Sequence, residues 1–557
     1  MRPGRVPWSR RAVAVVAGAA AAVVALLPGL PATPAGASGS SGTRPSYLAA
    51  AEYFGSSNPT TMWSSDLSGA PQAFALMKHD GFNTVGLVLP WGEFQPGLTP
   101  PRYDRTTFAR LDQLISEATH LHMGVILRLS YEYDDDPADQ MSGTRFGLLW
   151  SNPKVYRAWL DYVAAVHRNV ARFHNVRETY ISWEDLWEPV FQAQAAHTAA
   201  QQLALATSSG YRTWLRKHYT LKQVEFDYGT QFAGWTAVPT PPATKPSFKL
   251  MYQYQDTALV HRLFVPASKR YPGLTMETRV DVDSLYTGTQ VVGSYTHDVQ
   301  YRLPGTKVTG MYFSPYMGDP SSTLVETATE ALAAMTSTLT RMSRSSGGRP
   351  LIIYEYEFVS NSNEIDHDPA LTTNQVPTFL TKSEPLLSRF THGYALWTFR
   401  DYNLSPVYNP SFALGSRGWT LSGSARPVVR TSSTSAVAFG SGGGSVSQKI
   451  PAGDLTGTKP ASVSFQATAT GTTTLQVQLG TAPPQTVPIT SGTHPYTITA
   501  GPTATGTFTI RASGAVKVTA IGVYWFTQQG DVYSTTGAPQ IGATPLRSLN
   551  LQLTTAG

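Results

Sequence analysis

YISWEDLWEP at residues 180–189 and PLIIYE at residues 350–355 are the two stretches that decide the fold. Each is an apolar, β-branched or aromatic run that ends at or near a glutamate, Glu188 in the first and Glu355 in the second. Runs of this composition are typical of buried strands, where a charged side chain is costly unless it is compensated or used. All strands of a (β/α)8 barrel end at one rim, so that fold can bring two distant glutamates to a single site.

Strand-like and helix-like segments alternate between Tyr47 and Tyr402, which is the pattern of βα units around a parallel sheet. Between the second and third strand-like segments, apolar residues from Phe108 to Ala118 recur at helical spacing. We therefore predict a (β/α)8 TIM barrel over residues 47–402. Its predicted strands are residues 48–54, 84–89, 124–129, 179–186, 274–282, 308–313, 351–356 and 393–398.

The composition changes after Tyr402. Residues 403–557 contain only two acidic residues, Asp454 and Asp531, and are rich in Thr, Ser, Gly and Val. Alternating stretches such as SVSFQA (462–467) and TLQVQL (474–479) are typical of half-buried antiparallel strands. We predict that residues 403–557 form a small all-β sandwich. NPSF (409–412) followed by GWT (418–420) resembles the opening of jelly-roll carbohydrate-binding modules, which implies a sandwich of the jelly-roll type.

The N-terminus has the pattern of an export signal. Four arginines precede an apolar stretch over residues 12–27, and Ala35-Gly36-Ala37 follows as a cleavage site. We predict a signal peptide over residues 1–37, a disordered lead-in over residues 38–46, and a secreted or envelope-associated protein. The Arg10-Arg11 pair leaves both Sec and twin-arginine export open.

Cysteine is absent from the sequence, which excludes disulfides, thiol chemistry and Cys-ligated zinc. Four of the 42 basic residues lie in the predicted signal, so 38 basic residues face 36 acidic ones in the rest of the chain. This near balance gives no reason to expect nucleic acid as a partner. After the signal, no segment is long and apolar enough to predict a transmembrane helix.

Three motifs resemble those of the clan A retaining glycoside hydrolases, the cellulase- and mannanase-like TIM barrels. WEDLWEP (183–189) resembles the fourth-strand signature, aromatic-Glu-x-x-Asn-Glu-Pro, and the five-residue step from Pro350 to Glu355 resembles the seventh-strand signature. GYALWTFRD (393–401) resembles the eighth strand, whose Trp forms the floor of the sugar site. The resemblance implies that Glu188 is the acid/base, Glu355 the nucleophile and Trp397 part of the floor.

The fourth-strand motif departs from the family at one position. Trp187 stands where the family has the Asn that binds the 2-hydroxyl of the substrate. The departure leaves Glu184 as an alternative acid/base, because period-2 alternation would place it on the same strand face as Glu188. Glu357 is an alternative to Glu355 for the same reason.

Several other residues are candidates for substrate binding. Arg128 is predicted to face the site and orient the nucleophile, with an ion pair inside the barrel as the alternative. Aromatic faces stack on sugars, so we predict subsite walls at Trp91, Trp187, Tyr316 and Trp397, with ordinary core positions as the alternative. In the sandwich, Trp419, Tyr524 and Trp525 are candidates for a glycan-binding platform or for its core.

We predict neither a cofactor nor a metal site. The acidic run at residues 131–136 lacks EF-hand spacing and is interpreted as a solvated loop. The alternating charges Glu277, Arg279, Asp281 and Asp283 are interpreted as a polar interior or rim of the barrel on the fifth strand.

These observations predict a secreted hydrolase that cleaves a polysaccharide or oligosaccharide by double displacement with two glutamates and retention of configuration. A non-catalytic glycan-binding protein on the same scaffold and a transglycosidase are the alternatives. The sugar, its linkage and the choice between internal and terminal cleavage stay open.

Overall fold

The computed structural model describes residues 46–55, 61–129, 145–182, 188–280, 282–303, 308–312, 325–349, 351–358, 370–429, 435–450, 460–501, 506–525 and 527–555. The predicted signal peptide lies outside these residues, and so does the predicted lead-in except for its last residue.

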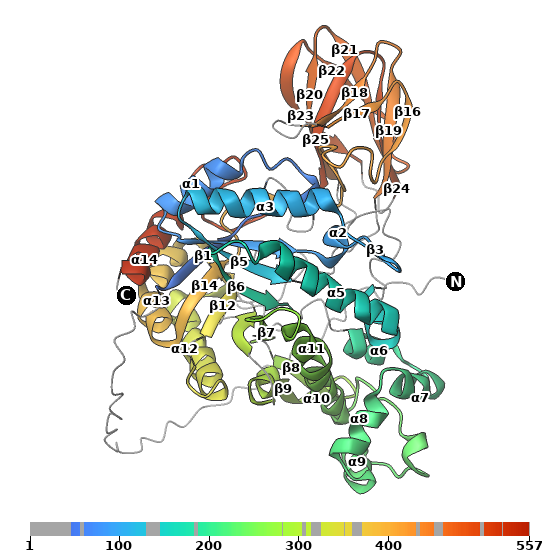
Figure 1. The fold of residues 1–557 in the computed structure, drawn as a ribbon, viewed down its shortest axis with the longest axis vertical. Coiled ribbons are helices and arrows are strands. Elements are labelled where there is room, and N and C mark those ends of the chain that lie inside the picture. The colour runs from blue at the N-terminus through green and yellow to red at the C-terminus, as the bar shows by residue number, and fades with distance from the viewer. Residues whose placement is uncertain are drawn as a thin grey trace.

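Parallel strands close into a barrel at the centre of the molecule (Figure 1). Within the described residues eight strands take part, and each pairs with the next along the chain, with the last closing on the first. The predicted TIM barrel is therefore confirmed. The strands are β1 (Leu48–Glu52), β2 (Thr84–Leu89), β5 (Gly124–Leu129), β6 (Val176–Ile181), β7 (Thr275–Arg279), β10 (Val308–Tyr312), β12 (Leu351–Tyr356) and β14 (Thr391–Leu396).

Amphipathic helices surround the barrel. In α3 the side chain of Asp104 accepts the N–H of Thr107 as an N-cap, and Leu111, Leu114 and Ile115 are buried at helical spacing. The helices that follow the strands are α1 (Ala70–His79), α3 (Arg105–His120), α5 (Pro153–Val170), α10 (Lys249–Ala258), α11 (Val265–Ser268), α12 (Ala328–Ser345), α13 (Val376–Phe390) and α14 (Ala543–Thr555). A short 3-10 helix, η6 (His297–Arg302), takes the helical position after β7.

Further elements extend the loops that follow the strands. Short helices form a separate group after β6, at the lower right of Figure 1, and a hairpin follows β7. The group after β6 consists of α6 (Glu188–Ala195), α7 (Ala199–Ser208), α8 (Tyr211–His218) and α9 (Leu221–Tyr228), and the hairpin consists of β8 (Val282–Thr287) and β9 (Gln290–Thr296). Two more short helices precede β6, namely α2 (Trp91–Phe94) after β2 and α4 (Arg145–Ser151) after β5. The remaining short elements are β3 (Gly97–Leu98), β4 (Pro101–Arg102), β11 (Val325–Glu326), β13 (Ala370–Leu371), η1 (Met62–Ser64), η3 (Trp235–Ala237), η4 (Pro246–Phe248), the π-helical η5 (Leu259–Phe264) and η7 (Thr373–Gln375).

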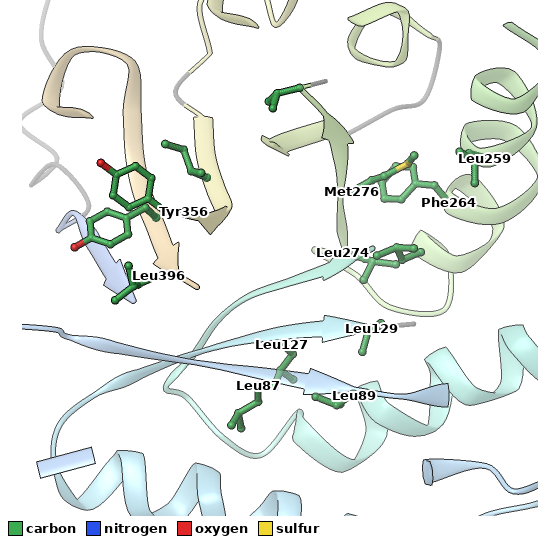
Figure 2. Packing of buried hydrophobic residues seen from close by; sticks show 14 of the residues in the cluster. Leu87, Leu89, Leu127, Leu129, Leu259, Phe264, Leu274, Met276, Tyr356 and Leu396 are labelled. Carbon is green, nitrogen blue, oxygen red and sulfur yellow. The ribbon is translucent and has the colours of Figure 1, made fainter. Parts of the chain in front are cut away.

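The main core lies between the barrel and its helices. Side chains alternate along β5, so Val125, Leu127 and Leu129 join this outer core while Ile126 joins a second cluster inside the barrel. Figure 2 shows Leu127 and Leu129 beside leucines of β2, and Met276 of β7 close to Phe264. The polar residues that alternate with the outer core are thereby directed to the barrel interior.

A ten-stranded sandwich follows the barrel within the described residues, as two antiparallel sheets of five strands. The predicted alternating stretches lie in β20 (Ala461–Ala469) and β21 (Thr473–Leu479), so the sandwich is confirmed. The other strands are β16 (Thr420–Gly423), β17 (Arg426–Val428), β18 (Ala436–Phe439), β19 (Gly444–Ile450), β22 (Gln485–Ile489), β23 (Gly492–Ala500), β24 (Gly506–Ala512) and β25 (Val516–Tyr524).

The chain returns to the barrel after the sandwich. Helix α14, red in Figure 1, packs beside α13 and buries Leu546, Leu549 and Leu553 in the barrel core. The Asn550 amide also donates to the Asp80 carbonyl at 2.9 Å. Residues 403–557 are therefore not one sandwich module as predicted, because their last helix is the barrel helix that follows β14. The sandwich is inserted between that strand and that helix.

Two predicted strands also differ from the structure. The fourth, β6, ends at Ile181, and Glu188 is the first residue of helix α6. Glu188 therefore does not lie on a strand, and the prediction that it shares a strand face with Glu184 is wrong for Glu188. The fifth, β7, ends at Arg279, and Asp283 belongs to the hairpin strand β8.

Candidate active site

Glu355 lies inside the barrel and is held by Arg128. The Arg128 Nη1 atom of β5 donates to Glu355 Oε2 at 3.1 Å, and its Nη2 atom donates to Ser182 Oγ at 3.2 Å. Arg128 is 1% exposed and Glu355 is 3% exposed. One arginine thus joins the third, fourth and seventh barrel strands where these strands end.

An irregularity in β12 directs Glu355 inward. Ile352 and Tyr354 belong to the cluster inside the barrel, whereas Ile353 and Tyr356 belong to the outer core. Strict alternation would therefore place Glu355 with Ile353 on the outer face. The pairing of β12 with β14 shifts register between Ile353 and Tyr356, and such a bulge re-aims the side chains that follow it.

Other carboxylates surround this ion pair. Glu52 ends β1 and Glu277 lies on β7, and both are buried. A Cβ at Gly86 would lie 3.0 Å from Glu52 Cγ, so the glycine makes room for this side chain. Burial raises the pKa of Tyr180 well above its usual value; Arg128 opposes the rise, and Glu52, Glu277 and Glu355 add to it. The three carboxylates therefore lie near one buried phenol.

The layer below these charges is aromatic and apolar. The rings of Tyr180 and Tyr354 stack with centroids 3.7 Å apart and planes 7° apart. Ala50, Ile126 and Ala395 pack around them. This layer fills the barrel, so the polar groups above it face the carboxyl ends of the strands, where barrel enzymes have their sites.

Trp397 follows β14 and borders the same charges. Its ring centroid lies 5.8 Å from the Arg128 guanidinium carbon, and Phe54, Val88 and Tyr402 pack around it. Trp397 is 7% exposed. The structure thus brings Arg128, Glu355 and Trp397 together.

Glu188 is positioned by helices rather than by a strand. Its Oε1 atom accepts a hydrogen bond from Gln192 Nε2 at 3.2 Å and lies 3.0 Å from where a Cβ of Gly147 would stand. Burial raises the pKa of Glu188, and the Gln192 bond opposes the rise. A raised pKa suits a general acid. The separation of about 5 to 5.5 Å expected between a retaining pair of carboxyl groups stays a prediction.

Three candidates, Glu184, Trp187 and Tyr316, lie outside the described residues, as does the acidic run at residues 131–136. Trp91 is described and is fully buried. Its ring contacts Phe146 and Trp159, and its indole N–H donates to Gln95 Oε1 at 2.7 Å. Trp91 is therefore a core residue and not a subsite wall.

Three residues of this region are absent from the sequence prediction: Glu52, Ser182 and Tyr402. Glu52 has a recognisable sequence signal, because it is a carboxylate at the end of a buried strand of small residues, as Glu355 is near the end of an apolar strand. Ser182 and Tyr402 carry no comparable signal, since neither is charged and neither ends a strand.

The described aromatic residues of the sandwich are buried or half-buried. Trp419 is 7% exposed, stacks on Phe412 and donates its N–H to the Asn409 carbonyl at 3.0 Å. Tyr524 and Trp525 are half-buried. Trp419 is thus core, and none of the described aromatic side chains of the sandwich is exposed.

The base of the sandwich is attached to loops at the carboxyl ends of β1 and β2. Arg417 Nη1 pairs with Asp104 Oδ2 at 3.0 Å, and the Asn409 N–H donates to Ser64 Oγ at 3.0 Å. The module therefore borders the face of the barrel that carries the candidate site.

Within the part of the chain that the structure describes, no three His, Asp or Glu side chains are arranged to hold a metal ion. The same part of the chain contains no helix with the length and apolarity needed to cross a bilayer.

No family model and no curated protein matches the sequence. Among solved structures, the chain is similar to the exo-β-1,4-mannosidase Op5Man5 from Opitutaceae bacterium strain TAV5, with 15% identity and a TM-score of 0.40 over 64% of this chain and 53% of that one. It is similar to a β-galactosidase from Rahnella sp. R3, with 14% identity and a TM-score of 0.46 over 64% of this chain and 51% of that one. The chain thus spans about half the length of these two proteins.

A further match is TmCBM61 in complex with β-1,4-galactotriose, with 16% identity and a TM-score of 0.19 over 22% of this chain and 99% of that one. Solved structures of clan A glycoside hydrolases are among those that the chain resembles, and at these identities the resemblance concerns the fold.

Proposed function

We propose that this protein is an exported retaining glycoside hydrolase, with Glu355 as nucleophile and Glu188 as acid/base. The observation that supports the proposal best is the buried Glu355, held by Arg128 beside Trp397 at the carboxyl end of a barrel strand. Arg128 favours the ionised form of its carboxylate partner, which is the form that attacks.

The proposed reaction has two displacements. Glu188 donates its proton to the leaving oxygen while Glu355 Oε attacks the anomeric carbon and forms a glycosyl ester. In the second step Glu188 takes a proton from water, which displaces Glu355 and releases the sugar. Glu184 stays the alternative acid/base, and its place in the chain two residues after the buried Ser182 supports testing it beside Glu188.

The charges around the site favour a neutral, hydroxyl-rich sugar. Carboxylates accept hydrogen bonds from hydroxyl groups and repel a uronate. Glu52, Glu277 and Glu357 are buried around or beside Glu355. Neutral plant-wall β-glycans and bacterial envelope glycans, including furanose polymers, are therefore the first substrates to test.

The test uses purified residues 38–557 on a panel of polysaccharides and aryl glycosides. Glu355→Gln and Glu188→Gln are expected to lose most of the activity of the wild type. If Glu188→Gln stays active and Glu184→Gln does not, the acid/base is Glu184. If the wild type binds a glycan from the panel but cleaves none, the protein is a glycan-binding protein and the proposal fails.

A further inference from the structure

Trp397 is held in place by a small aromatic cluster. Its ring centroid lies 4.6 Å from that of Phe54 and 6.5 Å from that of Tyr402. The ring centroids of Phe54 and Tyr402 are 5.3 Å apart. All three contacts are edge-to-face, an arrangement that fixes relative orientation as well as distance. We call Phe54, Trp397 and Tyr402 the Trp397 cluster.

Tyr402 also lies beside the carboxylates of the candidate site. Burial raises the pKa of Tyr402 well above its usual value, and the nearby charges of Glu357 and Glu355 raise it further. A side-chain hydrogen bond with Trp397 opposes the rise. The phenol therefore stays protonated and neutral, with its ring against that of Trp397.

The backbone of Tyr402 is fixed by the chain that leaves the sandwich. Strand β15 (Tyr402–Asn403) enters the sandwich and pairs antiparallel with β26 (Thr527–Gln528), which leaves it. Thr527 Oγ1 donates to Asn403 Oδ1 at 2.7 Å. We call residues 527–540 the return segment.

Asp401 binds the return segment at three points. Its Oδ1 atom accepts the Gly530 N–H at 2.8 Å, and its Oδ2 atom accepts Gln540 Nε2 at 3.0 Å. Its own N–H donates to the Tyr533 carbonyl at 2.8 Å. Asp401 is 7% exposed, so these bonds are sheltered from water.

Gly530 contacts the residue next to Trp397. A Cβ at this position would lie 2.6 Å from the Thr398 carbonyl oxygen and 2.7 Å from Thr398 Oγ1. Only glycine lets the return segment approach so closely. The return segment therefore supports the backbone immediately after Trp397.

We propose that the return segment of the inserted sandwich positions the Trp397 cluster, with Tyr402 and Gly530 as positioning residues of the candidate site. The inference rests on the proposed function for its effect on catalysis. It gives the sandwich a role that does not need a glycan platform, in agreement with the buried or half-buried state of its described aromatic residues.

The test compares Gly530→Ala with Gly471→Ala. Gly471 lies in the sandwich itself, between β20 and β21, and an added Cβ there would meet no atom within 4 Å. Because small misplacements of a site cost about 10²-fold in rate, kcat/KM of Gly530→Ala on the best substrate is expected to fall at least about 10-fold. Gly471→Ala is expected to match the wild type.

Two further measurements test the positioning role. Tyr402→Phe removes only the hydroxyl group and keeps the ring in the Trp397 cluster, and it is expected to lower kcat several-fold without changing Tm. Hydrogen exchange of the peptide covering residues 391–403 is expected to speed up in Gly530→Ala and not in Gly471→Ala.

The outcomes separate this inference from the proposed function. If the wild type cleaves nothing, the proposed function fails, and the exchange of residues 391–403 alone decides the positioning role. If Gly530→Ala does not fold, Tyr402→Phe decides it. Wild-type kcat in Tyr402→Phe, or unchanged exchange in a folded Gly530→Ala, would overturn the inference.

Discussion

Arg128 of β5 and Glu355 of β12 form a buried ion pair inside the barrel, although 227 residues separate them in sequence. The pair depends on the register shift in β12, because without it Glu355 would face the outer core. A local irregularity of one strand therefore creates the charged centre of the candidate site.

Replacement of Arg128 by Met is expected to destabilise the protein strongly. The substitution leaves Glu355 buried without its cationic partner, which typically costs about 3–5 kcal/mol. Thermal and denaturant unfolding measure the loss. Arg172→Met is the matched control, because Arg172 is 59% exposed in its pair with Asp112 and should contribute at most about 1 kcal/mol. Equal losses in the two variants would contradict the account of Arg128.

Replacement of Gln192 by Leu is expected to shift the pH dependence of catalysis. The Gln192 hydrogen bond lowers the pKa of Glu188 against the effect of burial, so its removal raises that pKa further. A general acid must be protonated, so activity would then persist to higher pH. The alkaline limb of kcat/KM should move upward in Gln192→Leu. An unmoved limb, together with an inactive Glu184→Gln, would assign the acid to Glu184.

His297 is expected to make stability pH-dependent above neutrality. Its ring lies between Asp256 Oδ1 at 2.8 Å and Asp283 Oδ2 at 2.7 Å, and it anchors the β8–β9 hairpin to α10. Burial lowers the pKa of His297, but the two carboxylates outweigh burial and raise it to about 10. In the unfolded chain the pKa of this histidine is about 6.5. The stabilisation that charged His297 gives the folded protein is therefore complete below about pH 6.5, and it is lost as the pH rises through about 10.

Unfolding of the wild type and of His297→Gln between pH 6 and pH 10 checks this prediction. The free energy of unfolding should fall more steeply with pH in the wild type. Parallel curves for the two proteins would show that His297 is not charged in the folded state.

Leu549 of α14 is expected to behave as a barrel core residue. It is 1% exposed, and its truncation to Ala should cost about 2–5 kcal/mol. Leu551 lies in the same helix and is 45% exposed, so Leu551→Ala should change stability by no more than about 0.5 kcal/mol. If Leu549→Ala is as stable as Leu551→Ala, the helix does not complete the barrel.

Periodicity and composition predict most of the architecture. The eight predicted strands all overlap barrel strands, because buried parallel strands are continuous apolar runs that composition reveals. The inward position of Arg128 follows from alternation along the third strand, whereas for Glu355 and Trp397 the expectation rests on the resemblance of their motifs to the family.

The insertion and the bulge could not be predicted in the same way. The composition shift after Tyr402 marks where the sandwich begins, but α14 shares the low charge of the sandwich and carries no local sign that it packs on α13. The bulge at Tyr354 and Glu355 arises where β12 pairs with β14, so the sequence of β12 alone does not reveal it. The motif around Glu188 resembles a strand end and predicts one there, whereas the chain is already helical at this residue.

The anomeric configuration of the first product distinguishes a covalent intermediate on Glu355 from direct attack by water. Proton NMR during the first turnovers of the best substrate distinguishes the two anomers before they equilibrate. A covalent intermediate on Glu355 predicts that the released sugar has the configuration of the substrate, and that Glu355→Gln releases none. An inverted product would contradict the account, because a water attacking directly leaves no place for Glu355 as a nucleophile.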